Sequence, residues 1–521
     1  MRQIGFKNFR KFINFPKMDL APITIFVGEN NAGKSTVVKG ILALADFLNR
    51  RQFVEWEDVL DTRESPEQME KNIAKNIKNQ RFYFNTSYLA HIGTFKRALC
   101  NKATDTTITF NTRIGILDIE IVVQGNRDDE DTVFGIIQSI KLTNTRYNQV
   151  FTFDLQKDEA EMEFLTMDPA LILKKNTEPR LMKELETYYS NVTKPHSMKF
   201  KISSAFEFYP DLIESLYSTA TNAIYAAAIE PENTDGRSYR GRRIGIDRRN
   251  RIVKDFSEED IQFLKLLYSL NEGGYVERTP FYIRHMFIES GIEYIYAHAV
   301  SQTVIYSAKD TNDYLSRTIH EFASNKIANN QREFICMWMK TFSIGQDFEI
   351  KSIGGEAHIV YILNNDGEKV NLADKGMGSI QLMVLLFRLA INLPRQKNSR
   401  SFRRGRGSIL IIEEPEQNLH PMLQSKLADL FYSLNQEYGF RFIIETHSEY
   451  LIRRSQVIVS QEYNEEEKLK WNPFKVYYFP SEGAPYDMVY ATTGMFENKF
   501  GDGFINEAGK LHMEVLKNTR K

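Results

Sequence analysis

This chain has few cysteines, almost no net charge and no long apolar run. Its 521 residues include two cysteines, Cys100 and Cys336, which stand too far apart for a metal-binding or redox pair. Because such sparse cysteine is typical of reducing compartments, we expect a cytoplasmic protein. The net charge of −1 excludes a general attraction to polyanions, so any contact with nucleic acid must depend on local patches. The absence of an apolar segment of membrane-spanning length predicts no membrane contact.

Metal-site spacing and internal repeats are also missing. The nine histidines are scattered, without the spacing of a zinc site or of a His-Asn-His nuclease. Nothing repeats at a fixed period. What the chain does have is apolar material, since 42% of its residues are hydrophobic, which excludes wholesale disorder. A chain of this length is expected to form about two to four domains.

A phosphate-binding loop is the most informative feature that is present. The stretch from Gly28 to Thr36 fits the pattern G-x-x-x-x-G-K-[S/T] at every fixed position. The apolar run 23–27 before it predicts a buried strand, and 37–48 after it predicts a helix. Backbone N–H groups converge in such a loop, where the helix dipole favours negative charge. This context disfavours the alternative, a glycine-containing loop that binds nothing, and the sequence predicts a nucleoside triphosphate site.

Within the loop, the residue types assign separate tasks. Lys34 would reach the β- and γ-phosphates, and the hydroxyl of Ser35 would ligate Mg²⁺. The candidate nucleotide-binding residues of the loop are Gly28, Asn30, Asn31, Ala32, Gly33, Lys34, Ser35 and Thr36.

Two carboxylates follow a second apolar run, at 409–412. In this Walker-B arrangement, Glu413 would hold the metal, usually through water, and Glu414 would orient or deprotonate the water that attacks the γ-phosphate. Aspartate is more usual at the first position, and the extra methylene of Glu413 moves its carboxylate outward. A surface charge cluster after a core strand is the alternative, and the phosphate loop elsewhere in the chain disfavours it.

Two further segments have weaker signals. Gly376, Gly378 and Ser379 form a turn before the helix predicted at 379–390, which is a second place for anionic oxygens. A glycine turn that only caps the helix is the alternative. His447 follows the apolar strand predicted at 441–444, where a histidine can hydrogen-bond a γ-phosphate and sense its loss. An ordinary loop histidine is the alternative there.

The order of these segments resembles the ATP-binding-cassette (ABC) superfamily, and more narrowly its branch with RecF, SMC-type heads and OLD (overcoming lysogenization defect) proteins. Within that branch, the chain is most similar to OLD-like ATPases of bacterial phage-defence systems, such as the Septu ATPase. The likeness is carried by Asn8 to Arg10, Gly28 to Thr36, Lys375 to Gln381, Glu413 to Pro421 and Glu445 to Ser448.

The resemblance implies that ATP and Mg²⁺ are the ligands and that two heads sandwich two ATP molecules. The signature turn of one head, here Gly376, Gly378 and Ser379, would contact the γ-phosphate held by the other. The segment 418–421 would be the D-loop at the dimer interface, and His447 the switch histidine. The partners implied are a second copy, in a homodimer or higher homo-oligomer, and an effector protein.

The chain departs from the family pattern in three ways. Lys375 and Met377 stand inside a signature that usually reads Ser-Gly-Gly, so we expect Lys375 to supply a phosphate-seeking charge. The segment 91–97, where a Q-loop glutamine is expected, offers Thr94 instead. No Asp-x-Asp pair follows His447, so we expect no nuclease of the Toprim type in this chain and assign any cutting to a partner.

The fold class expected is α/β. We predict an ABC-type ATPase head with a mixed, mainly parallel sheet, interrupted by a large, mostly helical insertion. The expected segments are an N-terminal ATPase lobe at 1–155, the insertion at 156–343, a C-terminal ATPase lobe at 344–474 and a mixed tail at 475–521 that packs on the ATPase.

Two basic runs complete the features of the sequence. Arginines crowd the segment from Arg237 to Arg251, and a second run extends from Arg395 to Arg406. Such runs suit phosphate backbones, and nucleic acid is therefore a candidate partner. A solvated loop, or arginines that pair with acids of a partner subunit, is the alternative.

The sequence thus predicts an ATPase that dimerises around ATP and regulates an associated effector, most simply a nuclease, in phage defence. The rival function is a RecF-like ATPase of DNA repair or chromosome maintenance that acts directly on DNA. A transporter subunit is disfavoured, because a large helical insertion suits arm-bearing heads better than compact transport cassettes.

Overall fold

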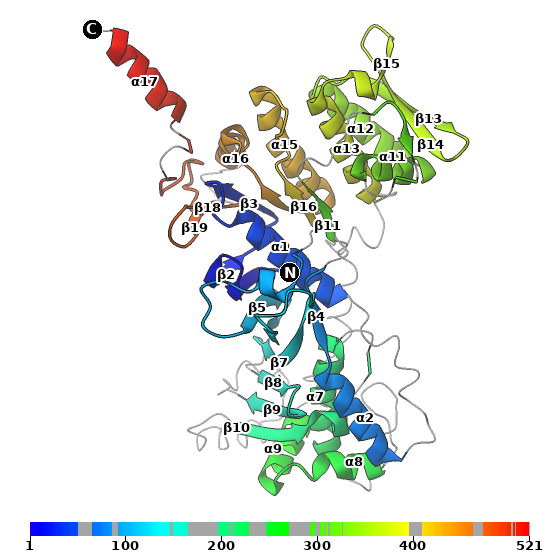
Figure 1. The fold of residues 1–521 in the computed structure, drawn as a ribbon, viewed down its shortest axis with the longest axis vertical. Helices are drawn as coiled ribbons and strands as arrows, with labels where there is room; N and C mark the ends of the chain where they lie inside the picture. The colour runs from blue at the N-terminus through cyan, green and yellow to red at the C-terminus, as the bar shows by residue number, and fades with distance from the viewer. Residues whose placement is uncertain are drawn as a thin grey trace. The chain divides into compact units, whose positions relative to one another are not determined.

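The computed structural model describes residues 1–49, 65–85, 92–145, 149–164, 196–206, 208–209, 212–228, 246–269, 292–296, 303–307, 309–310, 313–325, 327–394, 409–461, 472–501, 504–505 and 507–519. The chain forms two compact units (Figure 1). The first consists of Met1–Asp19 and Lys39–Glu289, and the second of Leu20–Val38 and Ser290–Lys521. None of the helices in the described ranges is long and apolar enough to cross a membrane.

The first unit combines antiparallel strands with helices. Its strands are β1 (Gln3–Phe9), β2 (Phe12–Asp19), β4 (Arg81–Tyr83), β5 (Thr107–Ile114), β6 (Leu117–Gln124), β7 (Phe134–Asn144), β8 (Gln149–Asp154), β9 (Glu159–Phe164) and β10 (His196–Lys201). Its helices are α2 (Pro66–Lys78), α3 (Phe95–Ala98), α6 (Ile202–Ala205), α7 (Leu212–Ala228), α8 (Ile246–Val253), α9 (Glu258–Ser269) and most of α1 (Lys34–Asn49).

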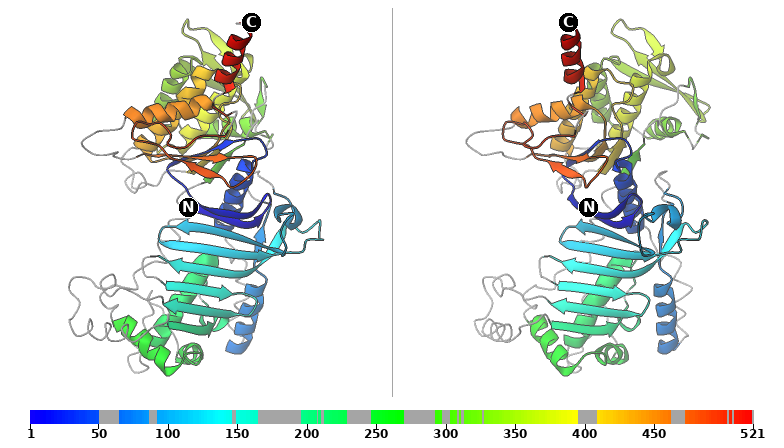
Figure 2. Two further views of the ribbon diagram at one scale, coloured as in Figure 1. Left: turned by 90° about the vertical axis from the view of Figure 1, so that its left-hand side faces the viewer. Right: turned by 60° about the vertical axis from the view of Figure 1, so that its left-hand side comes forward.

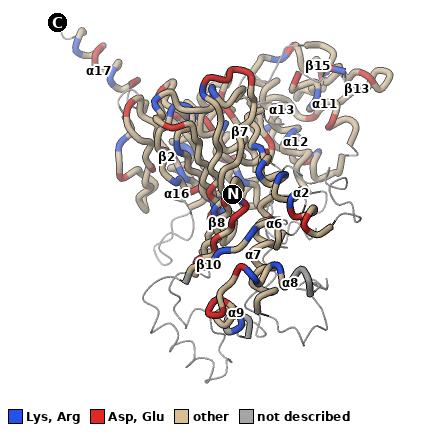
Figure 3. Tube along the Cα trace, turned by 60° about the horizontal axis from the view of Figure 1, so that its bottom comes forward, with Lys and Arg blue, Asp and Glu red and all other residues tan. Residues whose placement is uncertain are grey.

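These strands form one sheet of nine, in the order β10-β9-β8-β7-β6-β5-β1-β2, with β4 beside β7. In strands β5 and β6 every second residue is buried and the residues between them are half-buried or exposed, so one face of the sheet carries the apolar side chains. Helix α7 lies along that sheet (Figure 2), where Tyr217 meets Phe151 edge to face. Acidic and basic residues intermingle along the described elements (Figure 3).

The second unit contains the remaining elements and two sheets. Its strands are β3 (Ile23–Gly28), β11 (Ile292–Ile295), β12 (Tyr306–Ser307), β13 (Asp347–Ile353), β14 (Ala357–Leu363), β15 (Lys369–Asn371), β16 (Ile409–Glu413), β17 (Arg441–Glu445), β18 (Phe474–Phe479) and β19 (Tyr486–Met488). Its helices are the start of α1, α11 (Tyr314–Ser324), α12 (Asn329–Thr341), α13 (Met377–Asn392), α15 (Pro421–Tyr438), α16 (Glu449–Gln461) and α17 (Glu507–Thr519), with a 3₁₀ turn at Leu372–Asp374.

The larger sheet of this unit has the order β11-β16-β17-β3-β18-β19. All its pairings are parallel except that of β19 with β18. Its inner strands are continuous apolar runs that are buried along almost their whole length, as a parallel sheet covered on both faces requires. The smaller sheet, β12-β14-β13 with β15, is antiparallel.

A buried ionic network joins three elements of the second unit. Arg388 on α13 is 5% exposed and contacts Glu293 on β11 at 3.2 Å and Glu321 on α11 at 2.5 Å. Its Nε also donates to the hydroxyl of Thr318. Burial raises the pKa of Glu293, although the adjacent guanidinium opposes that rise. Because Arg388 forms ion pairs with acids on both β11 and α11, it holds α13 against β11, the edge strand of the parallel sheet.

These elements confirm the α/β class and, for the second unit, the mainly parallel sheet. The strand and helix that flank the phosphate loop are present as β3 and α1, and the strands expected around 409–412 and 441–444 are present as β16 and β17. The helix expected over 312–341 is divided into α11 and α12. Asn325 closes the first of these helices in an extended conformation.

The compact units divide the chain differently from the four expected segments. Strands β9 and β10 lie inside the segment expected to be mostly helical, yet they extend the antiparallel sheet beyond β8. In the expected tail, β18 pairs with β3 along six residues and so belongs to the parallel sheet itself. The pairings of β10 with β9 and of β18 with β3 join segments that are far apart in sequence, and the hydrophobic pattern of a strand does not predict which strand it pairs with.

Candidate active site

The phosphate loop lies between β3 and α1, as predicted. Its first glycine, Gly28, has φ +137° and lies against Phe479 of β18, so that a Cβ there would meet the Phe479 carbonyl oxygen at 2.1 Å. Only glycine fits this close approach. The Glu29 N–H donates to the same carbonyl at 3.1 Å. Asn31 takes a left-handed φ of 58°, and the Thr36 N–H donates to Gly33 at 3.0 Å as the helix begins. Strand β18 therefore anchors the loop.

Lys34 is folded back onto the loop. The side chain is 4% exposed, and its ammonium donates to the carbonyl oxygens of Gly28 at 3.0 Å and Glu29 at 2.8 Å. Burial lowers the pKa of Lys34, while nearby carboxylates, Glu445 foremost, act in the opposite direction. The cation is thus held at the loop by weak acceptors, from which it can turn toward a phosphate.

Three neighbouring parallel strands bring the other candidates to the same edge of the sheet. Glu413 at the end of β16 is level with Glu445 at the end of β17, which is level with Phe26 of β3. Because all three strands run in one direction, their carboxyl ends meet where the phosphate loop begins. The structure therefore brings together Glu413, Glu414, His447 and the loop, which are far apart in sequence.

Glu414 is held by its backbone as well as by its side chain. It has a left-handed φ of 46°, and its N–H donates to the Glu445 carbonyl at 2.7 Å. Its carboxylate accepts a hydrogen bond from the Gln417 amide, and its Oε1 lies 3.8 Å from Nε2 of His447. A non-glycine residue in this conformation is strained, and such strain recurs where a side chain must be aimed. The carboxylate is 30% exposed and can therefore meet a water molecule.

His447 is the middle residue of the short loop between β17 and α16. Burial lowers the pKa of His447, and the nearby Lys34 charge lowers it further, so the imidazole is neutral at neutral pH. The side chain is 38% exposed. Its backbone N–H donates to the buried carboxylate of Glu416 at 2.6 Å, and burial raises the pKa of Glu416. Glu416 thus fixes the loop from which the histidine projects.

Glu445 is the site residue that sequence reasoning missed. The hydroxyl of Ser35 donates to its Oε1 at 2.7 Å, and the side chain is 5% exposed. Burial raises the pKa of Glu445 to about 7, although the Ser35 hydrogen bond opposes the rise. The signal was available: Glu445 ends an apolar strand in the same way as Glu413. In the sequence, however, Glu445 only contributes to the family likeness, which implies no role for it.

The signature turn is packed against the D-loop of the same chain. Gly376 caps α13 and Gly378 touches Asn418, where an added Cβ would lie 2.5 Å from the carbonyl oxygen. The Ser379 N–H donates to Gly376 at 2.8 Å. One turn further along α13, the Gln381 amide donates to the Glu414 carbonyl at 3.2 Å. Helix α13 therefore contacts both the D-loop and the double-carboxylate segment.

The ammonium of Lys375 is hydrogen-bonded within its own chain, although its place in the sequence predicts a charge that is free to bind phosphate. Its ammonium donates to Asn364 Oδ1 at 2.7 Å and to the Ile344 carbonyl at 3.2 Å. Both acceptors belong to the same unit, so the lysine ties the turn to the smaller sheet. Thr94, at the place of the expected Q-loop glutamine, caps the short helix α3 by accepting from the Arg97 N–H.

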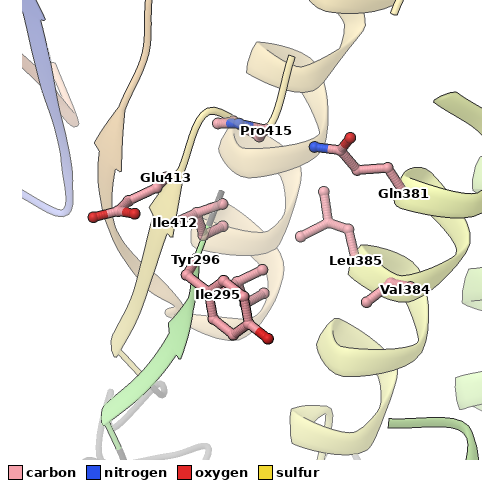
Figure 4. A pocket seen from close by; sticks show the side chains of 8 residues that line it. All are labelled: Ile295, Tyr296, Gln381, Val384, Leu385, Ile412, Glu413 and Pro415. Carbon is pink, nitrogen blue, oxygen red and sulfur yellow. The ribbon is translucent and has the colours of Figure 1, made fainter. Parts of the chain in front are cut away.

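A small cavity of about 20 Å³ lies between α13 and the end of β16 (Figure 4). Its polar lining includes Gln381, Tyr296 and Glu413, and the rest of the lining is apolar. In Figure 4 the Glu413 carboxylate points away from Gln381. The volume and the polar lining suit an ordered water molecule.

The donor set fits Mg²⁺ bound with a nucleotide. Among the described residues, no group of three or more His, Cys, Asp or Glu side chains could hold a metal ion by itself. Mg²⁺ in nucleotide sites takes one or two protein oxygens together with phosphates and water. Ser35 provides a hydroxyl, Glu413 and Glu445 provide carboxylates, and Oε2 of Glu445 is buried with no hydrogen-bond partner in the described part of the chain.

The basic runs fall mainly outside the described residues. The whole run from Arg395 to Arg406 does so, as do the arginines from Arg237 to Arg243. At the end of the first run, Arg251 on α8 pairs with Glu70 on α2 at 3.4 Å. At least this arginine therefore meets an acid of its own chain.

Comparison with known proteins gives one family and a set of distant structures. The profile of the family described as AAA ATPase domain matches residues 1–452. No curated protein matches the chain.

The solved structures that resemble the chain include three SMC head domains. One is from Pyrococcus furiosus, with an extended coiled coil and bound to the C-terminal domain of ScpA (11% identity, 100% of this chain and 99% of that chain, TM-score 0.31). Another is bound to the C-winged helix domain of ScpA (10%, 93% and 96%, TM-score 0.35), and a third is from Thermotoga maritima (8%, 94% and 100%, TM-score 0.32). Similarity at this level carries no information on function.

Proposed function

This chain belongs to the AAA ATPase domain family, and we propose that it hydrolyses ATP as an ABC-type ATPase that pairs around the nucleotide and regulates an associated effector. The observation that supports this most directly is the meeting of the phosphate loop, the double carboxylate and the switch histidine at one edge of a parallel sheet. An edge of this kind is where open α/β sheets bind ligands.

The loop and its lysine would bind the phosphates of ATP. The backbone of residues 28–36 and the helix dipole of α1 favour negative charge at this point. Lys34 would exchange the carbonyls of Gly28 and Glu29 for phosphate oxygens, a stronger, charge-assisted interaction. Bound Mg²⁺ would neutralise charge on the phosphates, with Ser35 as a ligand and Glu413 in support.

Glu414 would act as the general base. A water molecule at its carboxylate would attack the γ-phosphorus, the bond from that phosphorus to the bridging oxygen of ADP would break, and the proton of the water would pass to Glu414. The Gln417 amide donates a hydrogen bond to this carboxylate, and Nε2 of His447 lies 3.8 Å from it. His447 is neutral at neutral pH, so it could donate a hydrogen bond to the γ-phosphate without forming an ion pair with it.

A second copy would complete the site. Gly376, Gly378 and Ser379 would contact the γ-phosphate bound by the partner, and the D-loop at 418–421 would lie at the interface. The contacts of Gly378 with Asn418 and of Gln381 with Glu414 support a coupling of this turn to the catalytic segment. Loss of the γ-phosphate would then loosen the pair, so that ATP times the association.

The effector and the defence role rest on the likeness of the quoted motifs to OLD-like ATPases. We propose a nuclease as the effector, in bacterial phage defence. In a pull-down of the tagged chain from native cells, a nuclease or toxin should co-elute in stoichiometric amount. Recovery of the chain with DNA and repair factors instead would favour the rival RecF-like function.

The nucleotide part of the proposal has its own test. Lys34→Ala should abolish binding of a fluorescent ATP analogue, because it removes the cation of the loop while leaving the backbone in place. Lys39→Ala, on the same helix but outside the loop, is the matched control and should bind like the wild type. Equal binding by Lys34→Ala and the wild type would contradict the site.

A further inference from the structure

Glu445 occupies the position between the phosphate loop and the double carboxylate. It ends β17, which is the strand between β16 and β3 in the sheet. In register, its neighbours are Glu413 on one side and Phe26, two residues before the loop begins, on the other. Strand β17 is the direct neighbour of β3, which leads into the loop, whereas β16 is one strand further away.

The contact with Ser35 gives this placement a chemical meaning. The Ser35 hydroxyl donates to Glu445 Oε1 at 2.7 Å. The second oxygen, Oε2, is buried and has no hydrogen-bond partner among the described residues. A buried acceptor without a partner is costly, and a cation at the Ser35 oxygen would relieve that cost.

Glu413, by contrast, has its hydroxyl partner on the neighbouring strand β11. Its carboxylate accepts a hydrogen bond from the hydroxyl of Tyr294, a largely buried residue of β11. Strand β11 lies at the far side of β16 from β17. The two carboxylates thus have different hydroxyl partners: Tyr294 for Glu413, and the loop serine for Glu445.

We propose that Glu445 is the principal carboxylate that holds Mg²⁺ at Ser35 when nucleotide is bound, with Glu413 in a lesser, supporting position. The inference rests on the proposed function, since it concerns the metal of the same site. It assigns the metal-side acid to β17, where the contact with Ser35 and the unpartnered Oε2 favour it over the usual position at the end of β16. Direct ligation and a hydrogen bond to a metal-bound water are both open to a carboxylate at this position.

A purely structural role for Glu445, as an acceptor that orients Ser35, makes a different prediction. Such a role would change nucleotide binding to a similar degree with and without Mg²⁺. The metal role affects only the gain in affinity that Mg²⁺ provides. Binding measured in both conditions therefore separates the two.

The experiment compares the full-length wild type with Glu445→Gln and Glu413→Gln. Affinity for a non-hydrolysable ATP analogue is measured by titration calorimetry, once with Mg²⁺ and once with EDTA. We expect Glu445→Gln to keep its affinity in EDTA and to lose about tenfold or more of the Mg²⁺-dependent gain, the usual effect of removing a group that supports a metal. Glu413→Gln should lose less. Binding of Mn²⁺ in the presence of the analogue, followed by its electron paramagnetic resonance signal, should weaken in the same order.

Two results of these measurements would contradict a principal metal role for Glu445. An unchanged Mg²⁺-dependent gain in Glu445→Gln, or a larger loss in Glu413→Gln, would overturn the inference. Glu445→Asp keeps the charge and serves if the glutamine variant fails to fold: partial retention of the gain supports the metal role, and weaker binding in EDTA and Mg²⁺ alike refutes it. If the wild type binds no analogue in either condition, the proposed function itself fails.

Discussion

The two glycines of the signature turn should differ strongly in their sensitivity to substitution by alanine. Gly378→Ala would place a Cβ 2.5 Å from the Asn418 carbonyl oxygen and 3.0 Å from a methyl carbon of Leu419, whereas ordinary contact begins at about 3.4 Å. The nearer atom belongs to the backbone of the D-loop, where Asn418 already has a left-handed φ of 58°. The D-loop must therefore move, since a side-chain rotation cannot relieve the clash.

The expected magnitude follows from this geometry. Insertion of a methyl group into a packed contact costs about 1–3 kcal/mol. At Gly376, two residues earlier in the same turn, an added Cβ meets nothing within 4 Å. Gly376→Ala is therefore the matched control, and its effect on the isolated protomer should be within about 1 kcal/mol, as for a change at a helix N-cap.

The assay is thermal or urea unfolding of both variants, followed by circular dichroism, together with ATP turnover. Gly378→Ala should unfold earlier than Gly376→Ala. It should also lose turnover, because α13 contacts both the D-loop and the Glu414 carbonyl. Equal stability of the two variants would refute the packing argument. Full turnover in a destabilised Gly378→Ala would refute the coupling of the turn to the catalytic segment.

Two further predictions concern the second unit away from the site. Arg388→Met should lower the free energy of unfolding by about 3–5 kcal/mol, because Glu293 and Glu321 would lose the cation buried between them; a loss under about 1 kcal/mol in urea denaturation would contradict this. Burial, and then the adjacent His320, lowers the pKa of His358 below the usual 6.5. The unfolded chain therefore takes up this proton first, so the contribution of His358 to stability should be constant above about pH 6.5 and fall as the pH drops from there through the lowered pKa. His358→Asn, which can still hydrogen-bond Ser352, should flatten that dependence in unfolding measured from pH 7 to 5, and an unchanged slope would contradict the assignment.

Much of the site could be predicted because its signals are local. The phosphate loop is a continuous segment, and the apolar runs before Glu413 and His447 identify strands whose ends carry polar groups. Parallel strands present those ends at one edge, so the meeting of these residues followed from the pattern. The loop, the double carboxylate and the histidine are accordingly found together.

The rest depends on which strands are neighbours, and sequence pattern does not give this. Strand β17 lies between β16 and β3, which brings Glu445, a residue without an expected role, to Ser35. Strand β18 comes from the expected tail and holds Gly28 through Phe479. Lys375 was expected to seek phosphate, but its acceptors Asn364 and Ile344 come from segments that become its neighbours only in the folded unit.

The most direct test of the account is single-turnover hydrolysis by Glu414→Gln at saturating ATP. Glutamine keeps the size and the Gln417 contact of the side chain but removes the base. The variant should bind ATP as tightly as the wild type and cleave it about 10²-fold or more slowly, the usual contribution of a general base. Cleavage at the wild-type rate, with ATP bound, would contradict the assignment of Glu414 and with it the mechanism proposed for this site.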